Sequence, residues 1–220
     1  MITVITATHN HAPFLRGAID SVRAQTFQDW EHLVIDDGST DATPEILAGL
    51  CLEESRSAHP RLRMIRTANQ GFQAALNLGL AEARGDLVAF LDSDDEYSPD
   101  HLEHLRATLG DHDFVLGKFR FINCSNDPQP MVKDFYNPGL EIAVELTEVG
   151  TGVLFGKVAM FRRLGGFRPV KWCDTDFFNR MRQAGYSWAR ADHPTYRYYF
   201  GRVPNNMAIR ELAEDRRSRS

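Results

Sequence analysis

The stretch LVAFLDSDD, residues 87–95, decides the fold. Its first five residues are all apolar, as expected of a central parallel strand covered on both faces. Three carboxylates, Asp92, Asp94 and Asp95, follow at once. Such neighbours repel one another unless a cation or hydrogen bonds offset their charge. An acidic turn that caps a helix starting near Pro99 is the alternative interpretation.

Strand-like and helix-like segments alternate through the first half of the chain. Strands are expected at residues 2–8, 31–35, 62–65 and 87–91, and helices after Pro13, from Thr43 and over residues 71–83. This alternation predicts right-handed βαβ units in an α/β fold with an open, mostly parallel sheet flanked by helices. Ligands of such sheets bind at the carboxyl ends of the strands. Asp36 and Asp37 end the second strand there, as the acidic cluster ends the fourth.

The second half is less regular and predicts a smaller region beside the sheet. Residues 114–122 look like a strand, and residues 123–139 like a long loop that could serve as a lid. The rest predicts a strand at 153–155, a helix to Leu164, a helix over 174–184, and strands at 188–191 and 195–200. We expect one domain over residues 1–220, with a first half at 1–109, a second half at 110–207, and a terminal helix or tail at 208–220.

Composition narrows the class of protein. The 220 residues include 25 basic and 30 acidic side chains, for a formal net charge of -5, which disfavours nucleic-acid binding. Three cysteines without a CxxC pair make a poor disulfide framework, so a cytoplasmic location is the expectation. The N-terminal run lacks the basic region of a signal peptide, and no stretch of about 18 apolar residues predicts a transmembrane segment. Arginines near the C-terminus suit a solvated helix, with peripheral membrane contact as the alternative.

The acidic cluster predicts a metal site. A hard divalent ion takes oxygen ligands, and Mg²⁺ is typically held by one or two carboxylates plus substrate phosphates. The ion would bridge a diphosphate and stabilise charge on the leaving group. The second cluster, Asp36-Asp37-Gly38-Ser39, is weaker, because an Asp-Gly turn needs no ligand to explain it.

A series of motifs resembles family-two inverting glycosyltransferases of the GT-A fold. They cover residues 1–109 almost continuously and 150–207 more loosely. In order, they are VITATHN (4–10), SVRAQTF (21–27), VIDDGSTD (34–41), NQG (69–71), AALN (74–77), ARGD (83–86), FLDSDD (90–95), GGF (165–167), DTD (174–176) and AGY (184–186). Each motif is moderately specific, and their order and spacing carry the resemblance.

The resemblance makes residues 1–109 the nucleotide-sugar-binding half and residues 110–207 the acceptor-binding half, with residues 123–139 as an acceptor-side lid. It also implies a role for each matching residue on the donor side. Asp37 would bind the nucleotide base, with Thr8, His9 and Asn69 in the same nucleotide site. Asp92 would touch the ribose or diphosphate. Asp94 and Asp95 would hold Mn²⁺ or Mg²⁺ and the phosphates.

On the acceptor side, Asp174 resembles the catalytic base that would take a proton from the acceptor hydroxyl. Its position also suits an N-cap, which is the alternative interpretation. Trp172 would stack on a sugar ring, Asp176 would contact the sugar or acceptor, and Arg202 would neutralise the diphosphate.

Four positions depart from the family pattern. Cys173 stands where Glu often precedes the catalytic Asp, and Ala7 where proline is common. Leu76 replaces a frequent cation, and Val203 replaces a histidine associated with the metal or phosphates. The chain's own histidines show no metal-like pairing in sequence, so we assign them no metal.

The sequence therefore predicts a metal-assisted inverting glycosyltransferase of Rossmann-like GT-A type. The donor would be a nucleotide diphosphate sugar, with a UDP-sugar as the first guess. The acceptor would be the hydroxyl of a glycan, a lipid-linked molecule or another partner, in glycan or polysaccharide assembly. A second copy could complete the acceptor site. A non-catalytic sugar-nucleotide-binding module is the alternative.

Overall fold

The computed structural model describes residues 1–58, 60–123 and 150–200. Almost all of the predicted loop at 123–139 lies outside these ranges, as do the terminal segment at 208–220, Arg202 and Val203. None of the helices in the described ranges has the length and apolar character needed to cross a membrane.

The described residues form a seven-stranded, mostly parallel sheet with the order β3-β2-β1-β4-β8-β6-β9. Only β8 runs antiparallel to its neighbours, and the other pairs are parallel. This confirms the predicted α/β fold class. The strands are β1 (Ile2–Thr8), β2 (Trp30–Asp36), β3 (Leu62–Arg66), β4 (Leu87–Phe90), β6 (Phe114–Leu116), β8 (Leu154–Lys157) and β9 (Trp188–Arg190).

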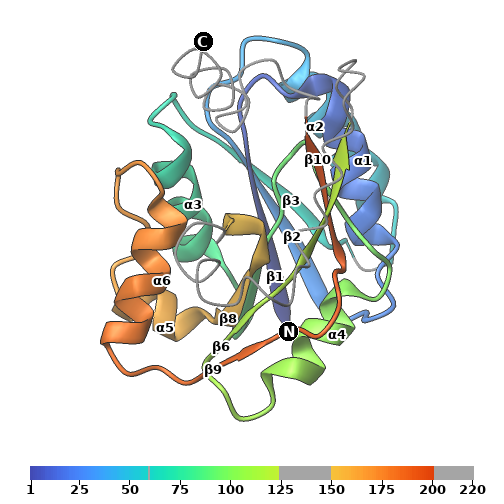
Figure 1. Cartoon of the computed structure of the whole chain (residues 1–220). Helices are drawn as coiled ribbons and strands as arrows, with labels where there is room; N and C mark the ends of the chain where they lie inside the picture. Colours follow the sequence, from blue (N-terminus) through green and yellow to red (C-terminus); the bar gives the residue numbers. More distant parts are fainter. Residues whose placement is uncertain (59, 124–149, 201–220) are drawn as a thin grey trace, which may run out of the picture.

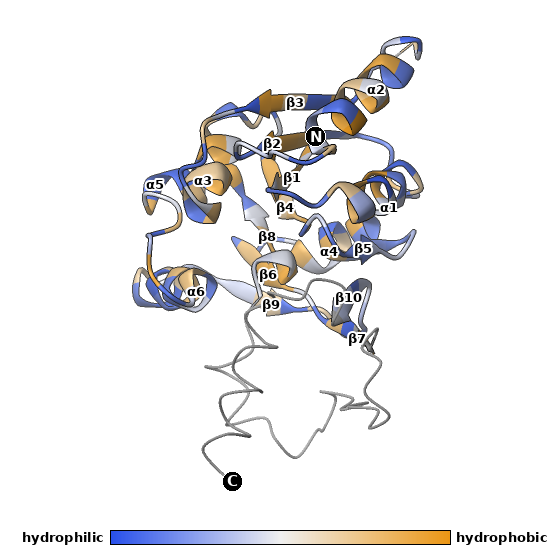
Figure 2. Ribbon diagram, turned by 90° about the horizontal axis from the view of Figure 1, so that it is seen from above, coloured by the Kyte–Doolittle hydropathy of each residue, from blue (hydrophilic) through white to orange (hydrophobic). Residues whose placement is uncertain are grey.

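Helices cover both faces of this sheet. In Figures 1 and 2, α3, α5 and α6 lie on one side and α1 and α4 on the other. α2 packs against β3 and α1. The bounds are α1 (Ala12–Arg23), α2 (Thr43–Ser55), α3 (Phe72–Glu82), α4 (His101–Leu109), α5 (Val158–Arg163) and α6 (Cys173–Gln183), with a 3₁₀ turn at Thr151–Val153.

Local sequence explains these elements. α1 has proline in its first turn, where a missing N–H costs nothing, and Leu15, Ala18, Ile19 and Val22 are its buried face. All residues of β1 and β2 are buried, because helices cover both faces of the strands. Their polar side chains pair with each other, as in the 2.8 Å hydrogen bond from Thr3 Oγ1 to Glu31 Oε1.

A second, three-stranded sheet corrects the prediction of one strand at 114–122. β6 ends just before Gly117, whose backbone N–H donates to Val153 O at 2.7 Å. The chain then continues in a new direction as β7 (Phe119–Asn123). A Cβ at Gly117 would lie 3.2 Å from that same oxygen. β7 pairs with β10 (Tyr196–Phe200), and β10 with the short β5 (Glu96–Tyr97), which sequence reasoning missed.

The turn before α6 is locked to α3. Asn77 exchanges two hydrogen bonds with the backbone of Phe167, at 2.8 and 2.7 Å. The Arg180 guanidinium donates to Leu164 O at 2.8 Å and to Gly166 O at 2.7 Å. Residues of the AALN and GGF motifs therefore fix the start of α6 relative to the sheet.

Gly166→Ala should destabilise the protein more than Gly165→Ala. Both glycines have positive φ, 66° and 76°, so alanine is strained at either position. Only at Gly166 would the new Cβ also collide with the side chain of Asn77. We expect a further loss of about 1–3 kcal/mol, as in overpacked cores. Urea unfolding of the two variants measures it, and equal losses would contradict this account.

Candidate active site

The candidate site lies at the carboxyl ends of β1, β2 and β4. Thr8 and Asp36 end neighbouring strands in register, and Phe90 ends β4 two residues before Asp92. Backbone hydrogen bonds continue past the strand ends, from Asp37 N to Thr8 O at 2.9 Å and from Leu91 N to Ile5 O at 3.0 Å. The two acidic loops are therefore anchored to the same edge of the sheet.

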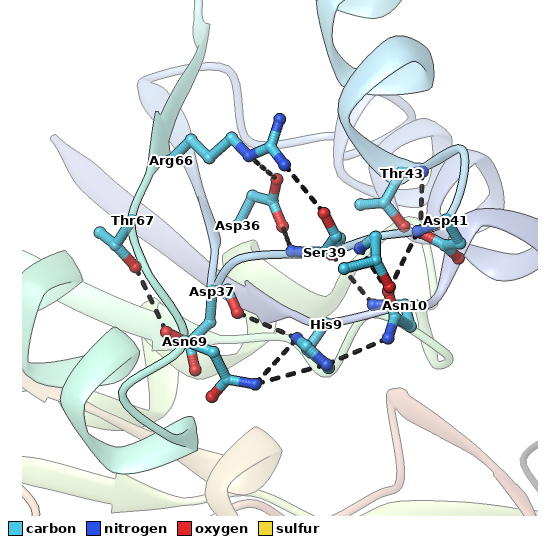
Figure 3. Close-up of polar contacts among 11 residues, drawn as sticks. His9, Asn10, Asp36, Asp37, Ser39, Asp41, Thr43, Arg66, Thr67 and Asn69 are labelled. Carbon is cyan, nitrogen blue, oxygen red and sulfur yellow. Dashed lines mark hydrogen bonds and ion pairs between the residues drawn. The ribbon is translucent and has the colours of Figure 1, made fainter.

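His9 is held in one orientation beside the acidic loop after β2, which begins with Asp37 (Figure 3). Its Nδ1 lies 2.9 Å from the carbonyl oxygen of Asp37, so Nδ1 must carry the proton. Nε2 then accepts from Asn10 Nδ2 at 3.0 Å, and Asn69 Nδ2 lies 3.4 Å from the ring nitrogens. The structure thus brings together three of the predicted nucleotide-binding residues, His9, Asp37 and Asn69.

The carboxylate of Asp37 is buried and already accepts several hydrogen bonds. Oδ1 accepts from Gln70 N at 2.9 Å and from Thr67 Oγ1 at 3.2 Å, and Oδ2 accepts from Gly71 N at 2.8 Å. Asp37 therefore fixes the turn that begins α3. A carboxylate has about four acceptor positions, so one remains for a ligand donor.

Asn10 is a site residue that sequence reasoning did not single out. It is in the left-handed region with φ 58°, which Asn adopts more readily than most residues. Its N–H donates to Ser39 Oγ at 3.0 Å, and its Oδ1 accepts from Thr40 N at 2.7 Å and Asp41 N at 3.2 Å. The only signal in the sequence was its place directly after a strand.

Tyr196 holds the acidic loop after β4, residues 92–95, against β10. Its fully buried hydroxyl accepts from Asp92 N at 3.1 Å and donates to Asp95 Oδ2 at 2.8 Å. The second oxygen of Asp95 accepts from Tyr199 N at 2.8 Å. Both oxygens of Asp95 are therefore engaged by β10, whereas Asp92 and Asp94 are half-buried.

His11, which sequence reasoning also missed, joins the loop after β1 to the acidic loop after β4. Its Nδ1 lies 2.6 Å from Oγ of Ser93, the residue between Asp92 and Asp94. No spacing in the sequence links His11 to Ser93, because they are 82 residues apart.

Asp174 approaches the acidic loop from α6. The N-cap interpretation is wrong: Trp172 occupies the N-cap with φ 60°, the helix begins at Cys173, and Asp174 lies in the first turn. Its Oδ1 accepts from Thr175 N at 2.7 Å. Trp172 itself is 44% exposed.

Asp176 is engaged in ion pairs next to that turn. Its carboxylate contacts Arg180 at 2.8 Å and Arg168 at 3.6 Å. Cys173 is buried, which raises the pKa of its thiol to about 11, so it is a neutral neighbour of Asp174.

The carboxylates of the acidic loop and of Asp174 lie close enough for their charges to act on one another. Burial, then the negative charges of Asp94 and Asp174, raise the pKa of Asp92 to about 7. Burial, then Asp92 and Asp94, raise the pKa of Asp95 to about 8. Burial also raises the pKa of Asp174. The ligand atoms of this cluster are all carboxylate oxygens, which suit a hard divalent ion. A bound ion would offset both the cost of burying the charged carboxylates and the repulsion between them.

Solved structures share this fold. A mannosyltransferase, PcManGT of Pyrobaculum calidifontis, solved in complex with GDP-Man and Mn²⁺, superposes with a TM-score of 0.76 and 24% identity, over 97% of this chain and 60% of that one. TarS of S. aureus in complex with UDP-GlcNAc superposes with a TM-score of 0.74 and 24% identity, over 94% and 60%. The fold is thus the GT-A fold of glycosyltransferases.

The family follows from sequence. The model of glycosyl transferase family 2 matches residues 3–164, so the chain belongs to this family. An uncharacterised glycosyltransferase, alr2836 of Nostoc sp., is 33% identical over 182 residues, which are 78% of this chain and 55% of that protein. The chain therefore spans only about half the length of that relative.

Metal-free protein should show the carboxylate repulsion as a pH-dependent effect of Asp94→Asn. Asp92 and Asp95 titrate above the ordinary carboxyl value near 4, so the stability linked to their protons is lost as pH rises from about 4 to about 8. Removing the Asp94 charge relieves this loss. We expect the variant to raise Tm relative to wild type by roughly 2–4 °C more at pH 8 than at pH 6.

Differential scanning fluorimetry with a chelator measures this difference. Comparison with wild type at each pH cancels the buried histidines His32 and His101, which titrate in both proteins alike. Asp111→Asn, at an exposed site, is the matched control and should show no such dependence. A gain that is the same at both pH values would refute the repulsion.

Proposed function

We propose that this chain is a metal-assisted, inverting glycosyltransferase that takes a sugar from a nucleotide diphosphate donor. The observation that carries the proposal is the position of Asp92. Its pKa is raised by burial and by the negative charges of both Asp94 and Asp174, although Asp174 comes from another part of the chain. A carboxylate pair suited to a metal thus faces a third carboxylate suited to a base, beside the His9 and Asp37 loop.

In this proposal the donor side is formed by the strand ends. His9, Asp37 and Asn69 bind the base, with Thr8 behind them, and Asp92 contacts the ribose or diphosphate. Asp94 holds Mn²⁺ or Mg²⁺, while Asp95, already engaged by Tyr196 and Tyr199, supports the loop and offers its remaining acceptor capacity to the metal. When bound, the metal would neutralise the diphosphate as it leaves. Arg202 is proposed as a further cation for the diphosphate.

The acceptor side is proposed at the first turns of α3 and α6. Gln73 Nε2 lies 3.4 Å from Val170 O, which joins the two. Phe72, Val170 and Trp172 are large apolar side chains exposed here, at 39%, 41% and 44%. Exposed apolar rings suit stacking against a sugar face, which is the role proposed for Trp172.

Asp174 is proposed as the catalytic base. It would accept the proton of the acceptor hydroxyl as that oxygen attacks the anomeric carbon from the side opposite the diphosphate, so the configuration inverts. Its raised pKa brings it closer to neutral pH, where a base is most effective. Asp176, bound by two arginines, is proposed to shape the acceptor side rather than to take the proton.

Donor binding tests the first half of the proposal. A thermal-shift panel of UDP- and GDP-sugars, with and without Mn²⁺, should give a metal-dependent rise in Tm with one donor class, because a ligand that binds only the folded state stabilises it. We expect Asp94→Ala to lose most of the metal-dependent part. An unchanged metal-dependent shift in this variant would remove Asp94 from the site.

Turnover tests the second half. With the donor so identified, Asp174→Asn should lower nucleotide release by about 10²–10⁴-fold while the donor Kd stays within a few-fold, since the base acts only in the chemical step. Asp176→Asn is the matched control in the same helical turn and should lose much less. If the wild-type protein binds the donor but releases no nucleotide, with either water or oligosaccharides as the sugar acceptor, the binding-module alternative is favoured.

A further inference from the structure

A second group of ligand-type side chains lies between α4 and the connection from β9 to β10. It consists of His104, Asp192 and His193. Asp192 Oδ1 lies 3.2 Å from His104 Nε2 and 2.7 Å from His193 Nδ1, and one ligand atom from each residue lies within 4.8 Å of the others. Three potential metal ligands therefore converge on one point at the surface.

These separations are close to those that a shared ion requires. Zn²⁺ binds nitrogen and carboxylate oxygen at about 2.0–2.2 Å in tetrahedral geometry, which places neighbouring ligand atoms roughly 3.3 Å apart. The His104 and His193 rings lie face to face, with centroids 3.9 Å apart and a 36° tilt. His193 is about half exposed, so its ring can turn its nitrogen toward an ion without repacking the core.

The hydrogen bonding of the cluster is incomplete without an ion. His104 Nε2 is buried and has no hydrogen-bond partner among the described residues, although it faces a carboxylate. The other ring nitrogen of His193, Nε2, lies 3.6 Å from Asp100 Oδ2, so a further carboxylate is close to the cluster.

Positive charge near the site opposes a cation. The Lys118 ammonium donates to the backbone oxygen of Asp192 at 2.9 Å, and Arg190 lies near Lys118. The carboxylates of Asp100 and Asp192 offset these two charges, and the site is open to solvent. We therefore expect moderate rather than structural-zinc affinity.

We propose that His104, Asp192 and His193 form a binding site for a borderline divalent transition metal, of the Zn²⁺ class, that is separate from the carboxylate cluster after β4. Two imidazoles and one carboxylate prefer Zn²⁺, Cu²⁺ or Ni²⁺ to Mg²⁺. A bound ion would tie α4 to the connection that leads into β10, three residues before Tyr196. It would thus hold the strand whose Tyr196 and Tyr199 contact the acidic loop after β4.

Zn²⁺ titration by calorimetry in excess Mg²⁺ tests the site, because Mg²⁺ competes for an all-oxygen cluster but poorly for imidazole. We expect about one Zn²⁺ per wild-type chain. His193→Ala and Asp192→Asn should each weaken binding by on the order of tenfold or more. Both side chains are at least half exposed, so neither change should unfold the protein, which a thermal melt verifies.

His112→Ala, an exposed histidine just beyond α4, is the matched control and should bind Zn²⁺ like wild type. Electron paramagnetic resonance of bound Cu²⁺ gives an independent readout, with nitrogen hyperfine structure in wild type that is reduced in His193→Ala. Equal Zn²⁺ affinity in wild type, His193→Ala and Asp192→Asn, or a Cu²⁺ signal from oxygen ligands alone, would overturn the proposal. None of these measurements depends on glycosyl transfer.

Discussion

The buried hydroxyl of Tyr196 is the contact on which the site depends. It accepts from the backbone of Asp92 and donates to the side chain of Asp95, so one atom ties β10 to both ends of the acidic loop. Gly152 leaves room for the ring, because any Cβ there would collide with it. The small second sheet therefore supports the loop on which these carboxylates lie.

This support separates two kinds of aspartate. Asp37 and Asp95 are buried, and donors from the protein use both oxygens of each, so they shape the loops. Asp92 and Asp94 are less buried, and the repulsion among the carboxylates acts on both Asp92 and Asp95. A motif of adjacent aspartates thus combines a structural residue with residues open to a ligand.

Strand and helix positions in the first half were predictable because a doubly covered sheet imposes strong local patterns. Residues 2–8 form β1 without change, and α1 forms where a helix was predicted, at Pro13. The prediction failed where tertiary contacts decide: Gly117 breaks a run of β-forming residues against Val153, and the two-residue β5 exists only by pairing with β10. The division of the chain near residue 109 and the ligand roles stay predictions.

The sequence by itself determined the βαβ order, the family, and the placement of carboxylates at strand ends, because periodicity and ordered motifs are local properties. Only the tertiary structure decided which side chains meet. Asp174 reaches Asp92, His11 reaches Ser93, and Asp192 reaches His104, each across some eighty residues or more. Such meetings depend on how helices and loops pack across the sheet, and the chain carries no local signal for them.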